Sequence, residues 1–467
     1  MGGTESEELL PATRRALLRR VATGQAEGRT PSLVGAVVRD GAPVWCGSRS
    51  MLEDHEPDGD TQYRIGSLTK TFVAVLIMRL RAEGLLDLAD PVGKYLDAGQ
   101  AGAVSIPQLS IPQLSIPQLT IAQLLSHTAG LAAEARGPWW ERTSGELRPS
   151  LGDIFGDQPQ PLPAGRQFHY SSPGFALLGA LAGQLRGQSW DEAVRCEILS
   201  PLGMARTTLR AQAPHAGGFA VHPWADVMQP EPAEHTGHMA PAGDMWSTAD
   251  DLCRWAAFLL DGDERVLPAA ALAEMRTPTS AGGYGFGLQI RKGQDRTLFG
   301  HTGSMPGFVA ALWVSPGDGL GAVALANATA GPAMAELAAD LVDIVVSSEP
   351  RLPQRWQPQP GIGPELLALT GLWYRGPRPT VLRVLSPETL ELTPASGPGR
   401  GSRFRASGDG TWTGLDGYYT GETLRLVPAA DGVGEYLDLG TFVFTREPYG
   451  TGSPLAAQPH RDGWQVG

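Results

Sequence analysis

Two residues able to share a proton, Ser67 and Lys70, stand three positions apart in the apolar stretch RIGSLTKTFVAVLIMRLRAEG. Positions i and i+3 of a helix lie on one face, so a helix starting here would place the lysine beside the hydroxyl. A hydroxyl becomes a nucleophile when a neighbouring base takes its proton. Lysine is such a base only if burial and the positive end of a helix dipole lower its pKa. Taken alone, the spacing is common by chance, and an N-cap serine followed by an ordinary lysine is the stronger interpretation.

Two further polar motifs reverse that balance. They are Tyr170 with Ser172, just ahead of a predicted helix in QFHYSSPGFALLGALAG, and His301-Thr302-Gly303, at a predicted strand end in RTLFGHTGSMPGF. What the three motifs indicate together follows from the family that their order resembles.

The order Ser-x-x-Lys, Tyr-x-Ser, His-Thr-Gly resembles the serine β-lactamase and penicillin-binding protein superfamily, most closely its class C-like branch. Further stretches carry the resemblance: TQYRIGSLTKTF, LLSHTAGL, PAGRQFHYSSPGFALLG, PLGM, PAGDMWSTADDLCRW and YGFGL. Together they cover most of residues 30–330. The resemblance implies a mixed α/β fold, with a β-lactamase-like antiparallel sheet flanked by helices and a helical subdomain.

The resemblance also implies roles for single residues. Ser67 would attack a carbonyl and carry the acyl group, with Lys70 as its base and Tyr170 as the second member of the proton relay. His301 would line the far wall of the site. The backbone N–H groups of Ser67 and Ser304 would form the oxyanion hole, in which each donor stabilises the transition state by a few kcal/mol.

Substrate contacts are expected from Ser172, Thr302, Gly303, Trp139 and Trp140. For the two tryptophans a place in the core is an equal alternative. Ser172 departs from the family pattern, which has asparagine at this position. Serine is shorter and bridges less far, so a contact with the lysine does not follow from the motif.

Charge and composition narrow the partners. The chain has 467 residues and a net charge of −12, which argues against nucleic acid or an anionic membrane. No cofactor motif is present, and His235 and His238 lack a third ligand, so we expect neither a cofactor nor a metal.

Cellular location is predicted from what the sequence lacks. No run has the length of a membrane span or of a signal-peptide core. The three cysteines, Cys46, Cys196 and Cys253, are far apart and are interpreted as buried thiols in a reducing compartment. A cytoplasmic location is therefore predicted.

Changes in composition and patterning along the chain predict its domain organisation. A catalytic domain is expected at 1–346, a Pro-rich linker at 347–365, a small antiparallel β-barrel at 366–450 and a disordered tail at 451–467. In the first domain, periodicity predicts helices at 67–83, 174–186 and 248–260, a hairpin at 32–47 with Asp40-Gly41 at its turn, and strands at 284–290, 296–303, 308–316 and 319–327.

Three copies of SIPQL at 105–119 and the diverged copy TIAQL precede a helix expected at LLSHTAGL. A proline in each copy bars a helix interior. The repeats are therefore interpreted as a lengthened surface loop, with a substrate-covering lid as the alternative.

The motifs do not decide whether the acyl group passes to an amine or to water. The predicted cytoplasmic location favours a stand-alone thioesterase of penicillin-binding-protein type, which releases and macrocyclises a non-ribosomal peptide held as a thioester on a carrier protein. That branch also implies a lipocalin-like C-terminal barrel. The alternative is a cytosolic serine hydrolase, either an esterase or a D-amino-peptide peptidase or carboxypeptidase, with the same machinery. A binding protein on a dead scaffold is disfavoured because Ser67, Lys70, Tyr170 and His301 are all present.

Overall fold

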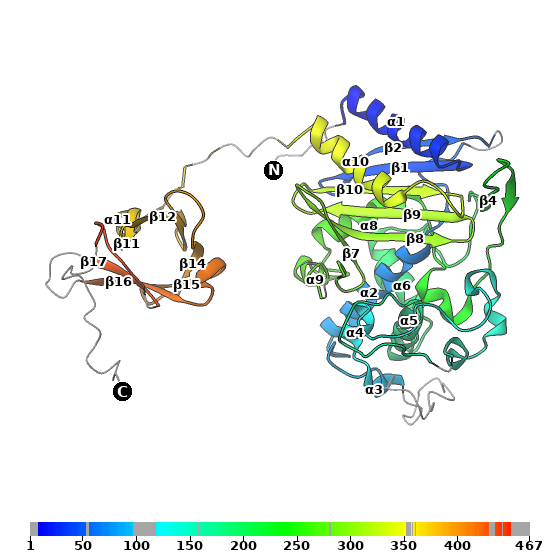
Figure 1. Ribbon diagram of the computed structural model, residues 1–467, viewed down its shortest axis with the longest axis horizontal. Helices are drawn as coiled ribbons and strands as arrows, with labels where there is room; N and C mark the ends of the chain where they lie inside the picture. Colours follow the sequence, from blue (N-terminus) through cyan, green and yellow to red (C-terminus); the bar gives the residue numbers. More distant parts are fainter. Residues whose placement is uncertain are drawn as a thin grey trace. The chain divides into compact units, whose positions relative to one another are not determined.

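The computed structural model describes residues 8–52, 56–96, 118–156, 158–279, 282–351, 356, 358–359, 361–428, 435–440 and 442–449. The chain divides into two compact units, Met1–Leu352 and Pro353–Gly467, and each is described by itself (Figure 1). The repeats up to residue 117 and the tail at 451–467 lie outside the described residues. Within the described part of the chain, no helix is long and apolar enough to cross a membrane.

A six-stranded antiparallel sheet joins the two ends of the first unit, in the order β2-β1-β10-β9-β8-β7 (Figure 1). Its strands are β1 (Ser32–Arg39), β2 (Ala42–Ser50), β7 (Gln289–Lys292), β8 (Thr297–Met305), β9 (Phe308–Ser315) and β10 (Leu320–Ala326). The predicted hairpin turn is confirmed, since Asp40 and Gly41 both have the positive φ (50° and 79°) that such a turn requires. The strand predicted at 284–290 is wrong for most of its length, because β7 begins only at Gln289 and Gly287 has a φ of 70°.

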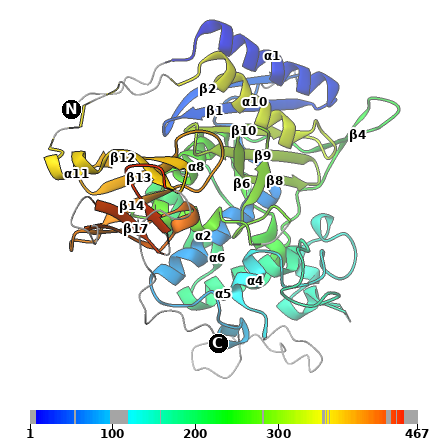
Figure 2. The ribbon, with the colours of Figure 1, turned by 60° about the vertical axis from the view of Figure 1, so that its left-hand side comes forward.

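Helices cover both faces of this sheet, so its central strands are apolar on both sides. On one face α1 (Pro11–Glu27) and α10 (Met334–Ser348) pack together, as Figure 2 shows. On the other face lies α8 (Ala249–Asp261), which belongs to the larger cluster of buried side chains. Val34 and Val323 belong to the cluster of that second face.

The helical part of the unit contains the elements that hold the site. Its helices are α2 (Thr69–Ala82), α3 (Gly93–Leu96), α4 (Ile121–Leu125), α5 (Ser172–Arg186), α6 (Trp190–Val194), α7 (Ser200–Leu202) and α9 (Ala269–Met275). Short helical turns are η1 (Gly66–Leu68), η3 (Trp140–Arg142), η4 (Gly145–Leu147), η5 (Leu151–Ile154), η6 (Arg195–Leu199) and η7 (Gly237–Ala242). Two small ribbons pair β3 (Tyr63–Arg64) with β6 (Trp246–Ser247) and β4 (Phe219–Val221) with β5 (Met228–Pro230).

The helix expected at LLSHTAGL begins earlier, inside the diverged repeat copy. Thr120 accepts a hydrogen bond from Gln123 N, and the Gln123 side chain accepts one from Thr120 N, which is a capping box. Ala122 stands in the first turn of this helix, where the other copies have a proline that such a position would tolerate. It ends at Leu125, and His127 has a φ of 55°.

The predicted start of α8 is confirmed, whereas the interpretation of the cysteines is wrong for two of the three. Thr248 caps α8 by accepting a hydrogen bond from Asp251 N. Cys253 is buried within that helix. Cys46 and Cys196 are exposed thiols, because strand and helix periodicity does not show which face of an element is covered.

The second unit is an eight-stranded antiparallel meander that nearly closes on itself. Its strands are β11 (Gly371–Arg375), β12 (Arg378–Ser386), β13 (Thr389–Pro394), β14 (Ser402–Ala406), β15 (Thr411–Gly414), β16 (Thr423–Pro428), β17 (Glu435–Leu439) and β18 (Phe442–Phe444), with α11 (Pro364–Leu369) before the first and η8 (Gly417–Tyr419) after β15. Tyr374 of β11 exchanges backbone hydrogen bonds with Thr445, which brings the two ends of the meander together. Inward side chains such as Trp373, Leu390 and Phe404 form a separate core.

Replacing a core leucine of this barrel should destabilise the second unit alone. Leu390 is fully buried, and Leu390→Ala is expected to lower the free energy of unfolding of that unit by about 2–5 kcal/mol. The catalytic unit has its own core, so its unfolding transition should not move. Calorimetry would measure both transitions, with Leu385→Ala, at 36% exposure, as the control. Equal shifts of both transitions would show that the two units unfold together.

Candidate active site

Ser67 and Lys70 meet at the start of a nearly buried helix. Ser67 lies in the turn η1, which leads directly into α2. Lys70 is fully buried, and its Nζ lies 3.0 Å from Ser67 Oγ. The same Nζ donates to the carbonyl oxygen of Ala242, at 2.7 Å. The spacing of three residues thus brings the amine into contact with the hydroxyl, as the sequence predicts.

The environment of Lys70 favours its neutral form. Burial lowers the pKa of Lys70 from its ordinary value of 10.5 to about 7, and the carboxylates of Glu134 and Glu141 act in the opposite direction. A charged ammonium with little water around it is unfavourable, and the ring centroids of Tyr170 and Phe175 lie 4.9 Å and 5.8 Å from Lys70 Nζ. The free amine is therefore far more accessible at neutral pH than for an ordinary lysine.

Tyr170 lies beside the amine, just before α5. Its ring centroid is 4.9 Å from Lys70 Nζ, and its hydroxyl is hydrogen-bonded to Ser67. Burial is the main cause that raises the pKa of Tyr170, so this phenol keeps its proton at neutral pH. The imidazole of His127 packs against the ring, with centroids 4.2 Å apart, and its Nδ1 accepts a hydrogen bond from Ser171 N. His127 therefore fixes the position of Tyr170.

His301 is held neutral on the opposite wall. Its Nδ1 contacts the carbonyl oxygen of Thr302, and since a carbonyl only accepts, Nδ1 carries the proton. Its Nε2 lies 3.0 Å from the hydroxyl of Tyr284, which must then be the donor. Burial and the nearby Lys70 lower the pKa of His301 to about 3. The lone pair of His301 is thus already occupied, and the ring carries no charge.

The backbone of β8 touches the turn that carries the serine. A Cβ at Gly303 would lie 1.9 Å from the carbonyl oxygen of Ile65, and a Cβ at Gly66 would lie 2.5 Å from Ser304 N. Gly66 also has a φ of 55°. Only glycine fits at both positions. The amides of Ser67 and Ser304 therefore lie on either side of this close contact, where the oxyanion hole is expected.

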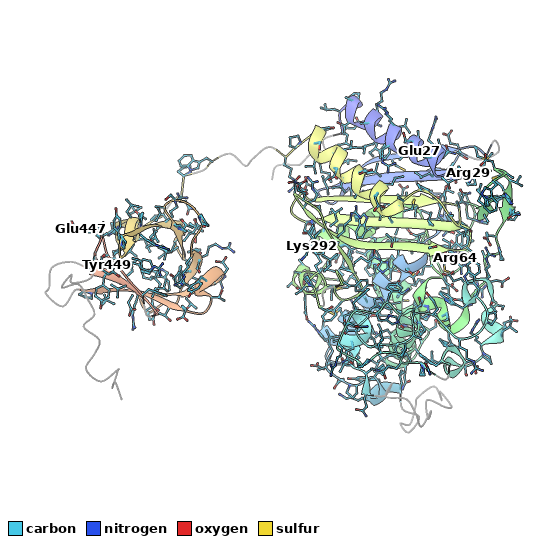
Figure 3. The ribbon with its side chains drawn as sticks, in the orientation of Figure 1. Glu27, Arg29, Arg64, Lys292, Glu447 and Tyr449 are labelled. Carbon is cyan, nitrogen blue, oxygen red and sulfur yellow. The ribbon has the colours of Figure 1, made fainter. Side chains whose placement is uncertain are left out.

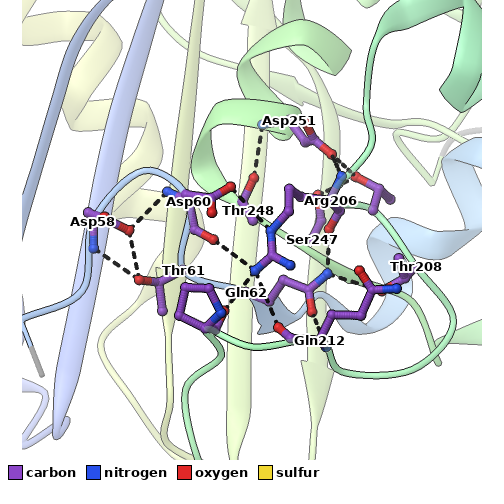
Figure 4. A network of polar contacts seen from close by, with 12 residues as sticks. Asp58, Asp60, Thr61, Gln62, Arg206, Thr208, Gln212, Ser247, Thr248 and Asp251 are labelled. Atoms are coloured by element: carbon purple, nitrogen blue, oxygen red, sulfur yellow. Dashed lines mark hydrogen bonds and ion pairs between the residues drawn. The ribbon is translucent and has the colours of Figure 1, made fainter.

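Buried polar contacts fix the segment that precedes Ser67. Arg64, inside the catalytic unit in Figure 3, forms a buried ion pair of 2.7 Å with Asp244. Figure 4 shows the network around Gln62, which lies two residues before Arg64 and whose side chain donates to Arg206 O and to the hydroxyl of Thr208. These contacts anchor the strand that delivers the nucleophile to two distant parts of the chain.

A pocket of about 540 Å³ opens onto Ser67. Of the residues predicted as a site, it is lined by Ser67, Tyr170, Ser172, His301, Thr302, Gly303, Ser304 and Trp140. Trp139 lies outside this lining and is 53% exposed. Lys70 reaches the Ala242 carbonyl, and its two hydrogen bonds do not include Ser172.

Sequence reasoning missed four polar residues that line the pocket, besides its apolar lining. They are Glu134, Glu141, Gln289 and Glu336. Gln289 Oε1 lies within hydrogen-bond distance of Thr302 N and Oγ1. Gln289 falls at the end of the motif YGFGLQ and Glu134 lies a few residues beyond LLSHTAGL, so proximity to a family motif was the available signal. Tyr284, which fixes His301, begins the motif YGFGL.

Comparison with known proteins gives the family of each part. A family model described as Beta-lactamase matches residues 17–347, and a model described as a domain of unknown function (DUF7586) matches residues 362–446. Over 296 residues the chain is 30% identical to penicillin-binding protein 4 of Amycolatopsis lactamdurans, covering 57% of this chain and 72% of that protein. The chain spans about half the length of several other curated relatives that it matches.

Two solved structures are similar in fold. The structure of SurE with D-Leu aligns with 94% of this chain and 100% of its own, at 25% identity and a TM-score of 0.55. A D-stereospecific amidohydrolase from Streptomyces sp. aligns with 70% of this chain and 96% of its own, also at 25% identity and a TM-score of 0.55. The chain therefore belongs to the beta-lactamase family and is a serine enzyme of the β-lactamase and penicillin-binding protein fold.

Proposed function

We propose that the chain is a peptide cyclase that forms an acyl-Ser67 intermediate from a peptidyl thioester and releases the peptide as a macrocycle. The observation that carries the acyl-serine is the contact of 3.0 Å between Ser67 Oγ and the buried Lys70 Nζ. A serine beside an amine with a pKa of about 7 is an activated nucleophile at neutral pH.

In this mechanism Ser67 Oγ attacks the carbonyl carbon of the donor while its proton moves to the free amine of Lys70. The oxyanion that forms accepts hydrogen bonds from the amides of Ser67 and Ser304. Collapse breaks the bond to the leaving thiol, which takes a proton from Tyr170, and Lys70 returns a proton to Tyr170. An amine of the bound peptide then attacks the acyl carbon, and the displaced Ser67 oxygen regains its proton through the same pair.

The likeness to SurE supports the cyclase, since it extends over 94% of this chain and thus includes the second unit. It was determined with D-Leu, which fits a donor with a D-configured residue. The likeness to a D-stereospecific amidohydrolase covers 70% of the chain and favours hydrolysis as the second candidate. Both candidates use Ser67, Lys70 and Tyr170, and they differ in whether an amine or water reaches the acyl-serine.

Product analysis separates the two candidates. The full chain would be incubated with a synthetic peptidyl thioester that ends in a D-residue and carries a free amine. We expect a product one water lighter than the linear acid, and we expect none with Ser67→Ala. Mass spectrometry would measure both species. Linear acid as the sole product, still dependent on Ser67, would identify a hydrolase, whereas turnover by Ser67→Ala would contradict the acyl-serine.

The rate of acylation should follow the ionisation of Lys70. Because only the free amine takes a proton, the rate of Ser67 labelling by a fluorophosphonate probe should rise about tenfold per pH unit below about pH 7 and level off above it. His301, with a pKa of about 3, does not ionise in this range. Labelling would be timed by gel fluorescence, with His301→Ala keeping the profile and Lys70→Ala losing it. A rate independent of pH in wild type would contradict Lys70 as the base.

The buried base should also lower the stability of the catalytic unit. Between pH about 7 and 10.5 the unfolded chain holds a proton on Lys70 that the folded chain releases, so stability rises with pH through this window. Lys70→Met removes the buried amine and should raise the free energy of unfolding by about 2–5 kcal/mol near pH 7, with a smaller gain at pH 9.

Urea unfolding at the two pH values would measure the effect. Lys292→Met, at an exposed lysine labelled in Figure 3, should leave the stability unchanged. A less stable Lys70→Met protein would show that the hydrogen bonds of Lys70 outweigh its desolvation.

A further inference from the structure

The pocket at Ser67 has an uneven distribution of charge. Its lining includes the carboxylates of Glu134, Glu141 and Glu336, and none of the described lining residues is a lysine or an arginine. Glu336 is paired with Arg291 at 3.3 Å. Glu134 and Glu141 have no ion-pair partner among the described residues. Two carboxylates thus face the substrate space with no ion-pair partner in the lining, and the positive charges of Lys70 and Arg64 act on them from outside that lining.

Both carboxylates lie near the reacting atoms and are fixed in place. Their charges act on Lys70 and on Tyr170, raising the pKa of each. The indole of Trp140 donates to Glu134 Oε2 at 2.7 Å, and that of Trp139 donates to Glu141 Oε2 at 2.6 Å. A carboxylate accepts up to about four hydrogen bonds, so each retains free acceptor capacity. Trp139 therefore lies outside the pocket lining but helps to hold Glu141, which belongs to that lining.

The opposite wall does not offset this negative charge. His301 stands there with its Nε2 occupied by the hydroxyl of Tyr284 and its Nδ1 directed to a backbone carbonyl. Protonating Nε2 would break the contact that Tyr284 makes as a donor. A substrate carboxylate in this pocket would meet two glutamates and a neutral imidazole, so like charges would repel it.

We propose that Glu134 and Glu141 bind a primary ammonium group of the substrate beside Ser67, and that the pocket rejects substrates with a free carboxylate there. The inference rests on the proposed acyl-transfer function and names its substrate class, a D-configured acyl donor that bears a free amine. The amine is that of the donor residue itself if the substrate is a D-amino acid amide, as in the hydrolytic candidate, and that of the far end of the peptide if the donor is a peptidyl thioester, whose donor residue has an acylated α-nitrogen. A charge-assisted pair with two carboxylates suits an ammonium, which has three donors and no acceptor.

Binding without turnover tests the subsite. Ser67→Ala protein cannot be acylated, and calorimetry on this full-length variant would compare D-leucinamide, N-acetyl-D-leucinamide and N-acetyl-D-leucine, which are cationic, neutral and anionic. We expect the cation to bind at least about tenfold more tightly than the neutral compound, and the anion to bind most weakly. Equal affinity of the first two compounds, or no detectable binding of D-leucinamide, would overturn the assignment of the ammonium to the donor residue.

Variants assign the effect to the two residues. In the Ser67→Ala background, Glu134→Gln and Glu141→Gln should each reduce the preference for the cation about tenfold while leaving the affinity of the neutral compound unchanged. Glu146→Gln replaces an exposed glutamate outside the pocket lining and should leave the preference intact. Thermal unfolding of each variant would verify that it is folded. A full preference in both pocket variants would contradict the assignment.

Further ligands locate the amine and separate this inference from the proposed function. A peptide amide ending in D-leucine, with its amine free or acetylated, tests the remote position. Tight binding of the free peptide alone assigns the remote amine, and tight binding of D-leucinamide assigns the donor residue. If neither ligand binds tightly, no ammonium subsite exists and the proposal is overturned. Acylation of wild type by the uncharged N-acetyl-D-leucyl thioester reports on the acyl-serine alone, because this donor carries no ammonium.

Discussion

The catalytic unit depends on the burial of one amine. Lys70 is fully buried and lies on α2, in which the run from Phe72 to Met78 is buried as well. This burial on all faces agrees with the apolar run FVAVLIM, which an ordinary surface helix would interrupt with polar positions. It also explains why Lys70 Nζ donates to the carbonyl oxygen of Ala242, because a buried donor without a partner is costly.

A second constraint acts on the wall across the pocket. A cation at His301 would lie close to Lys70 and would make the proton that Lys70 accepts from Ser67 harder to hold. Tyr284 prevents this by donating to the only ring nitrogen on which a second proton would fit. The rings of His301, Tyr284 and His127 form one packed group, in which the ring centroids of His127 and Tyr284 are 4.7 Å apart. The neutral state of the wall is thus a result of packing and of hydrogen-bond direction together.

Local features of this protein were predictable from the sequence, and contacts between distant segments were not. The spacing of Ser67 and Lys70 determines their contact, because helix geometry alone brings them together. The turn at Asp40-Gly41 and the cap at Thr248 follow from the conformational preferences of single residues. The pairing of β1 with β10 joins segments from the two ends of the domain, and the alternation that predicted these strands does not determine such long-range pairing.

The lining of the pocket shows why the rest could not be predicted. The partner of Lys70 is a backbone carbonyl, which has no signature in a sequence. Trp139 and Trp140 are adjacent, yet one is exposed and the other is buried in the lining, because the short turn η3 sends consecutive side chains in different directions. Glu134 lies on an irregular segment and Glu141 in the three-residue turn η3, and periodicity makes no prediction for either.

The cap of α4 bears on how this gene could change in length. Every SIPQL copy has the same Ser-x-x-Gln spacing as the Thr120–Gln123 capping box, with proline at a first-turn position that tolerates it. Loss or gain of whole five-residue units by slippage during DNA replication would therefore always leave a competent helix start before LLSHTAGL. Natural variants of this protein should differ at this point in steps of fifteen nucleotides, about five residues each, without cost to the helix that follows.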